Sequence, residues 1–266
     1  MLSPSHSIRV FYFAVKSTPY QRDNWGMNVI HQWLANRGYV VLSVNFRGST
    51  GFGKKHFLSS TGEWGRKMHE DILDATQWLI DEKIADPQKI AIMGGSYGGY
   101  ETLVALTQSP ETYACGVDLV GISNLVTFLE SFPPYWRPLV ESSVIRIGGD
   151  HRTEAGRAFL LSRSPFSYID HIQKPLLIGQ GENDPRVPKR ESDQMVQRMQ
   201  EKNIPVFYVA YPNEGHGFVR PENNRSFWGV AELFLTQCLG GRAEPLGDIA
   251  KASSMRIEAG SLEDLQ

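Results

Sequence analysis

The chain has 266 residues, with 27 Lys and Arg against 29 Asp and Glu, which leaves a formal net charge of -2. This near-neutral charge argues against nucleic acid or an anionic membrane as the main partner, because both select basic surfaces. Hydrophobic residues make up 41% and charged residues 21%, a composition typical of folded rather than disordered proteins. No apolar run approaches the ~20 residues that span a bilayer, and the N-terminal stretch lacks a signal-peptide pattern. We therefore expect a soluble, cytoplasmic protein.

Short apolar runs alternate with amphipathic stretches along the chain. We predict strands at 9–15, 39–44, 89–93, 114–120, 176–179 and 206–210, and helices at 27–37, 64–82, 98–108, 188–202 and 224–239. This alternation predicts crossover units and a largely parallel sheet that is covered on both faces. Residues 121–173 break the pattern with Pro and aromatic side chains, and we expect an insertion of short helices there. One domain is expected over residues 1–245, with 246–266 as a loosely attached polar tail.

The two cysteines, Cys115 and Cys238, lie far apart in predicted regular structure. Their spacing matches neither a disulfide framework nor a metal site, so we expect two buried thiols in a reducing compartment. No spacing of His, Cys and carboxylate residues matches a metal signature. No glycine-rich dinucleotide motif opens a helix after the first strand. We therefore expect no metal and no other cofactor.

A G-x-S-x-G motif, Gly94-Gly95-Ser96-Tyr97-Gly98, lies between the predicted strand at 89–93 and the helix at 98–108. A nucleophile elbow has this position in α/β-hydrolases, because glycines allow the sharp strand-to-helix turn that exposes the serine. A glycine-rich turn without a chemical role is the alternative. The position between strand and helix favours the elbow.

A nucleophilic serine needs a base, and the base needs a third group to orient it. In α/β-hydrolases the chain order is Ser, then Asp or Glu, then His. Asp184 follows the predicted strand at 176–179, and His216 follows the strand at 206–210. The carboxyl ends of parallel strands share one edge of the sheet, where ligands bind. The sequence therefore predicts a triad of Ser96, His216 and Asp184 in an α/β-hydrolase fold.

These segments together resemble the catalytic domain of the prolyl oligopeptidase family of serine peptidases, and most closely its acylaminoacyl-peptidase and dipeptidyl-peptidase-like branch. The resemblance rests on Gly38–Leu42, Asn45–Gly53, Met93–Tyr100, Gly179–Pro188 and Glu214–Phe218. It implies that Ser96 is the nucleophile, that His216 is the general base and then the acid, and that Asp184 orients the imidazole. It also implies that Tyr97 donates its backbone N–H to the oxyanion.

The resemblance also suggests residues that contact the substrate. Arg186 matches an arginine that binds a substrate carbonyl in some relatives. The alternative is that Arg186 forms a salt bridge that anchors the loop carrying Asp184, the acid loop. Four aromatic residues of the insertion are expected to line the substrate pocket, or else to form the insertion's own core: Phe128, Phe132, Tyr135 and Trp136.

Three features depart from the family pattern. Relatives usually carry an N-terminal β-propeller, so we expect a free-standing hydrolase or a fragment, whose uncovered face favours a homo-oligomer. Where relatives have His-Gly-Gly-Pro, this chain has Lys16-Ser17-Thr18-Pro19, which leaves the amide of Thr18 or Ser17 as the second oxyanion donor. Some relatives use a tyrosine hydroxyl where this chain has Phe52, which cannot donate a hydrogen bond.

The expected function is a serine hydrolase that cleaves peptide or ester bonds of small acyl substrates through an acyl-enzyme. A carboxylesterase with little peptidase activity is one alternative. A degenerate hydrolase-fold domain that at most binds ligands is another. The complete triad favours catalysis, whereas the Lys16-Ser17-Thr18 segment favours degeneracy.

Overall fold

The computed structural model describes residues 9–13 and 20–265. Within these residues the centre is a seven-stranded sheet of order β2-β1-β3-β4-β5-β6-β7, and only β7 runs antiparallel to its neighbour. The strands are β1 (Arg9–Phe13), β2 (Tyr39–Leu42), β3 (Ile90–Gly95), β4 (Cys115–Leu119), β5 (Leu176–Gly181), β6 (Val206–Tyr211) and β7 (Arg256–Ala259).

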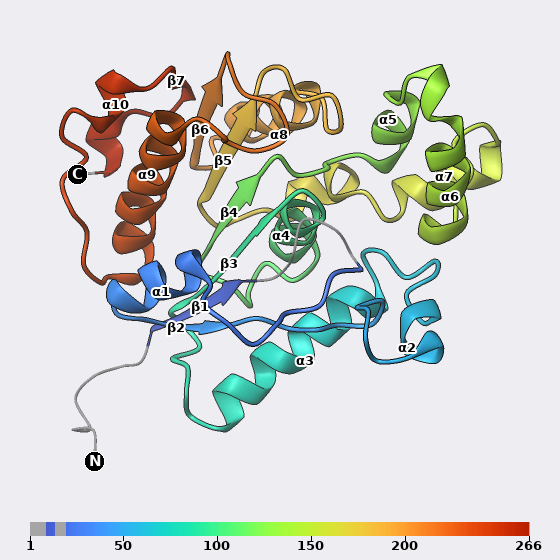
Figure 1. Ribbon diagram of the computed structural model, residues 1–266, viewed down its shortest axis with the longest axis horizontal. Coiled ribbons are helices and arrows are strands. Elements are labelled where there is room, and N and C mark those ends of the chain that lie inside the picture. The colour runs from blue at the N-terminus through green and yellow to red at the C-terminus, as the bar shows by residue number, and fades with distance from the viewer. Residues whose placement is uncertain (1–8, 14–19, 266) are drawn as a thin grey trace.

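Helices cover both faces of this sheet (Figure 1). The α-helices are α1 (Val29–Asn36), α2 (Lys54–Leu58), α3 (Lys67–Asp81), α4 (Tyr97–Gln108), α5 (Leu125–Glu130), α6 (Arg137–Ile147), α7 (Glu154–Leu161), α8 (Arg190–Glu201), α9 (Pro221–Leu239) and α10 (Ile249–Ala252). The 3-10 turns are η1 (Pro134–Trp136), η2 (Pro165–His171) and η3 (Leu262–Leu265). The predicted parallel sheet with helices on both faces is confirmed.

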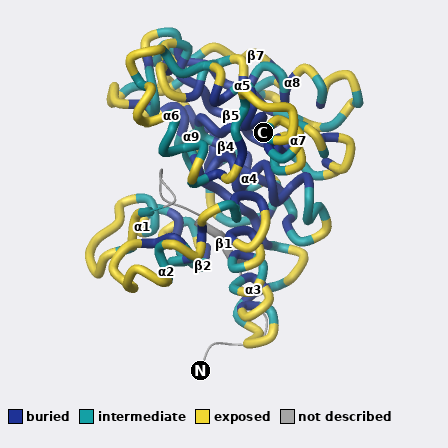
Figure 2. The backbone as a smooth tube through the Cα atoms, turned by 90° about the vertical axis from the view of Figure 1, so that its right-hand side faces the viewer, coloured by how far each residue is buried: buried dark blue, intermediate teal, exposed yellow. Residues whose placement is uncertain are grey.

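Alternating side chains divide the interior into two cores. On β3, Ile90 and Ile92 belong to the core that also holds side chains of α3, α4 and α8, whereas Ala91 and Met93 belong to the core that holds side chains of α1 and α9. Successive side chains of a strand point to opposite faces, so one buried strand contributes to both cores. Figure 2 shows the buried backbone concentrated along the central strands and α4.

The insertion at residues 121–173 holds α5, η1, α6, α7 and η2 (Figure 1). Leu125, Leu129, Ile147 and Leu160 are buried in the core on the α4 side of the sheet. The insertion is therefore anchored to the domain by apolar packing, and it lies near the end of β3 that leads into α4.

The C-terminal segment differs from the expected loose tail. β7 pairs with β6 through Ala210↔Arg256 and Val209↔Ile257, and the buried Leu265 of η3 packs in the core on the α9 side. The prediction of a loosely attached tail is wrong for the described residues. Only Ala259 is buried in β7, so the four-residue strand has no apolar alternation that the sequence could reveal.

The two cysteines also differ from expectation, because Cys115 and Cys238 form a disulfide across a sequence separation of 123 residues. The prediction of two buried thiols is wrong. The long helix α9 packs across β3, β4 and β5, and its last turn approaches the start of β4, with the two Cα atoms 6.4 Å apart. This proximity comes from tertiary packing and leaves no mark in the sequence spacing.

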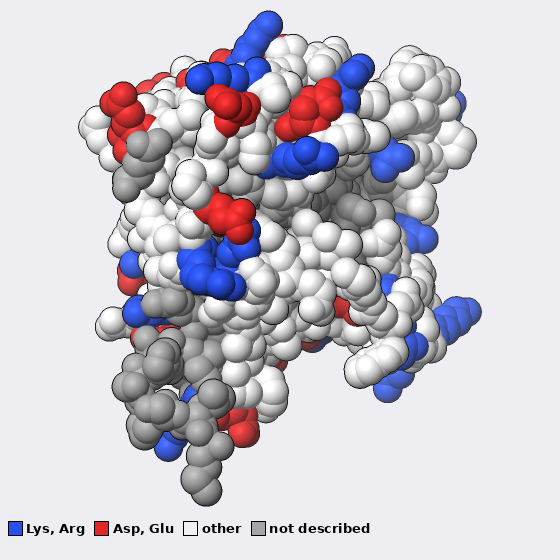
Figure 3. Space-filling model, turned by 60° about the vertical axis from the view of Figure 1, so that its left-hand side comes forward, with Lys and Arg blue, Asp and Glu red and all other residues white. Residues whose placement is uncertain are grey.

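Acidic and basic side chains lie side by side along the upper edge of the face in Figure 3, and a further group of both signs lies left of its centre. Within residues 9–13 and 20–265, none of the helices combines the length and the apolar character that a membrane span needs.

Candidate active site

Ser96 stands between β3 and α4 with φ 56° and ψ -113°, a strained conformation for a residue with a side chain. Its N–H donates to the carbonyl of Leu119 at 2.8 Å, which ties the turn to the end of β4. A Cβ atom on Gly99 would lie 2.2 Å from Asp118 Oδ1 and 2.6 Å from Gly121 Cα, so only glycine lets α4 start this close to β4. This is the geometry of the predicted nucleophile elbow.

The three residues of the predicted triad are joined by hydrogen bonds. His216 Nδ1 lies 2.7 Å from Asp184 Oδ2, and His216 Nε2 lies 2.9 Å from Ser96 Oγ. An ionised carboxylate only accepts hydrogen bonds, so Nδ1 carries the proton and Nε2 is free to accept the serine hydroxyl. The structure therefore brings together the three side chains that the strand order predicted.

The carboxylate of Asp184 is fixed by its own loop. Oδ1 accepts the N–H groups of Arg186 at 2.8 Å and Val187 at 2.9 Å, and the side chain is completely buried. These two bonds occupy one oxygen and aim the other at His216. The acid therefore has a single orientation toward the imidazole.

The loops that carry the acid and the base are also joined to each other. The N–H of Asn183 donates to the carbonyl of Glu214 at 3.0 Å, and a Cβ on Gly181 would lie 2.1 Å from the carbonyl oxygen of Gly215. The buried Glu214 carboxylate accepts the N–H of Val219 at 3.0 Å, which closes the turn around His216. Asp184 and His216 are thus held by one interlocked pair of loops.

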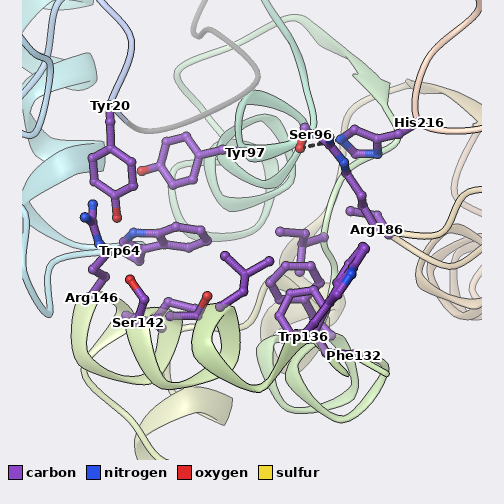
Figure 4. Close-up of a pocket in the computed structure, with 16 residues that line it drawn as sticks. Tyr20, Trp64, Ser96, Tyr97, Phe132, Trp136, Ser142, Arg146, Arg186 and His216 are labelled. Carbon is purple, nitrogen blue, oxygen red and sulfur yellow. Dashed lines mark hydrogen bonds between the residues drawn. The ribbon is translucent and has the colours of Figure 1, made fainter. Parts of the chain in front are cut away.

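A cavity of about 560 Å³ opens beside Ser96 and His216 (Figure 4). Phe128, Phe132 and Trp136 line it, as predicted for substrate-binding residues. The three rings also contact one another, with centroids 4.8 Å apart for Phe128 and Phe132 and 5.6 Å apart for Phe132 and Trp136. They are therefore both a small aromatic cluster and a wall of the pocket.

Tyr135 does not line this cavity, and 78% of its surface is exposed. Its prediction as a pocket residue is wrong. Consecutive residues of a 3-10 turn point about 120° apart, so η1 directs Trp136 inward and Tyr135 outward.

Arg186 lines the pocket near Ser96 and His216 (Figure 4). Among the described residues no carboxylate pairs with its guanidinium, and only its backbone N–H contacts Asp184. The acid loop is therefore anchored by backbone hydrogen bonds and not by the alternative salt bridge. The guanidinium is available to a ligand.

The structure describes one of the two predicted oxyanion donors. Tyr97 is the first residue of α4, so its N–H has no acceptor within the helix. The Tyr97 hydroxyl is used elsewhere, since it donates to the buried Glu101 at 2.5 Å, and burial holds the pKa of this phenol well above its usual range. Thr18, the predicted second donor, lies outside the described residues with the rest of 14–19.

Phe52 is 45% exposed and stacks under the guanidinium of Arg22, with Arg22 Cζ 4.5 Å from the ring centroid. It does not line the pocket. The loop after β2 therefore supplies no hydroxyl from this position.

Sequence reasoning missed the far end of the pocket. Tyr20, Trp64, Ser142 and Arg146 lie there (Figure 4). They come from three separate segments: the loop before α1, the turn before α3, and α6. No motif connects these segments, so the sequence offered no signal for them.

Comparison with known proteins identifies this arrangement. Residues 25–242 match the sequence model of the Prolyl oligopeptidase family. The chain belongs to this family. The predicted resemblance to prolyl oligopeptidase catalytic domains is confirmed.

The chain is similar to dipeptidyl aminopeptidase BIII of Pseudoxanthomonas mexicana, with 56% identity over 93% of this chain and 36% of that protein. It is 52% identical to dipeptidyl peptidase family member 6 of Caenorhabditis elegans, over 87% of this chain and 31% of that protein. The chain therefore spans about a third of the length of these prolyl oligopeptidase family relatives.

Among solved structures, a puromycin-hydrolyzing peptidase of Mycobacterium tuberculosis superposes with a TM-score of 0.83 and 29% identity, over 91% of this chain and 36% of that one. This likeness confirms the α/β-hydrolase fold predicted from the sequence.

Proposed function

We propose that this prolyl oligopeptidase family domain is a serine hydrolase that cleaves peptide or ester bonds of small acyl substrates. The proposal rests on one observation, the continuous hydrogen-bond chain from Ser96 through His216 to Asp184 beside an open pocket. A nucleophile, a base and an orienting acid in this order are what acyl transfer to serine requires.

In the proposed reaction Ser96 Oγ attacks the substrate carbonyl carbon while His216 Nε2 takes the hydroxyl proton. Asp184 holds Nδ1–H and stabilises the imidazolium that forms. The Tyr97 N–H donates to the former carbonyl oxygen, which has become negatively charged. His216 then protonates the departing amine or alcohol, which leaves the acyl group on Ser96. A water molecule then attacks the acyl carbonyl carbon while His216 takes its proton, and His216 returns a proton to Ser96 Oγ as the carboxylic acid product leaves.

A carboxylesterase with little peptidase activity is the second candidate. The chain has Lys16-Ser17-Thr18-Pro19 where the family resemblance implies His-Gly-Gly-Pro, and loss of one oxyanion donor typically lowers kcat by about 10²–10³. Amides have the poorer leaving group and depend more on that stabilisation. A strong preference for p-nitrophenyl esters over aminoacyl p-nitroanilides would favour the esterase.

Labelling with a fluorophosphonate probe, followed by peptide mass spectrometry, tests the proposal directly. We expect Ser96 to carry the adduct and Ser96→Ala to remain unlabelled and inactive. Labelling of another serine with Ser96 free would exclude the proposed nucleophile. A folded protein that neither reacts with the probe nor turns over any ester would support the degenerate domain instead.

The cytoplasmic location inferred from the sequence stays a prediction, and the Cys115–Cys238 disulfide weighs against it because disulfides persist in oxidising compartments. Acid quenching of intact cells, followed by alkylation under denaturing conditions, distinguishes a reducing from an oxidising compartment. Two alkylated cysteines would support a reducing compartment, whereas an intact disulfide would support an oxidising one. Self-association into a homo-oligomer is a separate proposal, which sedimentation velocity tests.

A further inference from the structure

The pocket beside Ser96 has a second charged end. Figure 4 shows Tyr20, Ser142 and Arg146 at the end of the pocket away from Ser96 and His216. The space between the two ends is walled largely by apolar and aromatic side chains. A substrate whose carbonyl lies at Ser96 can therefore reach Arg146 only with a part of its acyl or leaving group that crosses this apolar region.

Arg146 has no anionic partner at this end. Its guanidinium carbon lies 4.2 Å from the ring centroid of Tyr20 and 5.2 Å from that of Phe57, so two rings hold it from the side. No carboxylate among the described residues forms an ion pair or a hydrogen bond with it. A half-buried guanidinium without an anion keeps its capacity to bind one.

The neighbouring polar groups are also donors. Ser142 and Ser143 lie one helical turn before Arg146 on α6, and no hydrogen bond joins their hydroxyls to another described residue. The buried indole N–H of Trp64, at the same end of the pocket, has no acceptor either among the residues described. Buried donors are normally paired, so an unpaired one beside a free guanidinium favours an incoming acceptor.

The pocket contains no acid that would repel an anion. Its charged lining consists of Arg146 and Arg186, with His216 of the triad, and includes no Asp or Glu among the described residues. The residues outside the described ranges, 1–8, 14–19 and 266, contain no Asp or Glu in the sequence. Among the described residues the pocket therefore offers no carboxylate to a substrate ammonium group, whereas two guanidinium groups are suited to bind oxygen anions.

We propose that the Arg146 end binds a substrate carboxylate, so that this domain selects acyl compounds that carry a negative charge. The inference rests on the proposed hydrolase function and adds the substrate class. The carboxylate belongs either to an acidic side chain of the acyl residue or to a dicarboxylic group on its nitrogen. Arg146 acts here as a specificity-determining residue and takes no part in the chemical step.

Two length-matched pairs of substrates test the proposal and separate these sources. The first pair is the α-ethyl esters of N-acetylglutamate and N-acetylglutamine, and the second is the ethyl esters of N-succinyl- and N-succinamoyl-phenylalanine. Within each pair the chain length is the same, and a charged carboxylate is replaced by a neutral amide of similar size. We expect kcat/KM to favour the charged member of at least one pair by about 10- to 100-fold, mainly through KM, as a charged hydrogen bond typically contributes.

Arg146→Met should reduce this preference to about onefold, and Arg146→Lys should retain part of it, because lysine keeps the charge without the planar donor pair. Arg137→Met is the matched control, since Arg137 is exposed on the same helix and does not line the pocket. It should leave the charge preference as in the unchanged protein.

Binding to the inactive Ser96→Ala protein gives a second measure that does not need turnover. Calorimetry should show tighter binding of the charged member of the same pair, and Arg146→Met added to Ser96→Ala should abolish the difference. Turnover of the neutral esters with no charge preference, or a preference that Arg146→Met leaves unchanged, would overturn this inference alone. Absence of turnover for all four esters together with an unlabelled Ser96 would instead overturn the proposed hydrolase function.

Discussion

Replacement of Asp184 by asparagine tests how the acid orients the base. Oδ1 of Asp184 accepts two backbone N–H groups, so an asparagine side chain at this position must place its oxygen there and its NH2 toward His216. That NH2 group donates to Nδ1 and forces the imidazole into the tautomer with the proton on Nε2. Nε2 then cannot accept the proton of Ser96. We expect Asp184→Asn to lower kcat by about 10⁴, since the wrong tautomer has an effect of this size in serine proteases.

The assay is steady-state turnover of a p-nitrophenyl ester at saturating concentration, with circular dichroism to confirm that the variant is folded. Asp170→Asn is the matched control, because Asp170 is an exposed carboxylate paired with Lys202 at 2.5 Å on the surface. It should retain full activity. A folded Asp184→Asn protein that keeps more than about a tenth of the original kcat would refute the orienting role of this carboxylate.

Three further predictions concern stability. Burial raises the pKa of Asp118 from 3.8 to about 8, so the folded protein holds a proton that the unfolded chain has lost, and stability falls as pH rises between these values. Urea titrations should show that the free energy of unfolding of the unchanged protein falls by about 2–3 kcal/mol more than that of Asp118→Asn between about pH 6 and 8. The same pH dependence in both proteins would contradict this prediction. Replacement of Cys115 and Cys238 by alanine should lower the free energy of unfolding by about 2–5 kcal/mol. An unchanged melting temperature would contradict this prediction. Gly99→Ala places a methyl group 2.2 Å from Asp118 Oδ1, so it should lower the free energy of unfolding by about 1–3 kcal/mol and slow the labelling of Ser96. Gly26→Ala is the control, because its methyl group meets nothing within 4 Å, and it should change neither the stability nor the labelling rate.

The triad was predictable because its position depends on topology rather than on detailed packing. Once alternating strands and helices indicate a parallel sheet, the carboxyl ends of its strands must share an edge. Ser96, Asp184 and His216 each follow such an end, after β3, β5 and β6. Their contact therefore follows from the order and number of the strands, which the sequence pattern predicts.

Other features depend on which surfaces pack together, and the sequence does not encode that in a local pattern. Cys115 and Cys238 meet only because α9 lies across β4. The Arg146 end of the pocket needs α6 to fold over the turn that contains Trp64. The strand β7 was missed for a different reason, since three of its four residues are exposed and show no apolar periodicity.

The position of β7 has a consequence for solubility. β6 bonds to β5 along one side, and without β7 its other side would present free N–H and C=O groups to solvent. The residues of β6 are Val206-Phe207-Tyr208-Val209-Ala210-Tyr211, a strongly β-forming and uncharged run. Such an open strand is a template for intermolecular sheet growth. β7 covers it with Arg256 and Glu258, and its only buried residue is Ala259, so the strand that borders solvent is short, charged and poorly suited to aggregation.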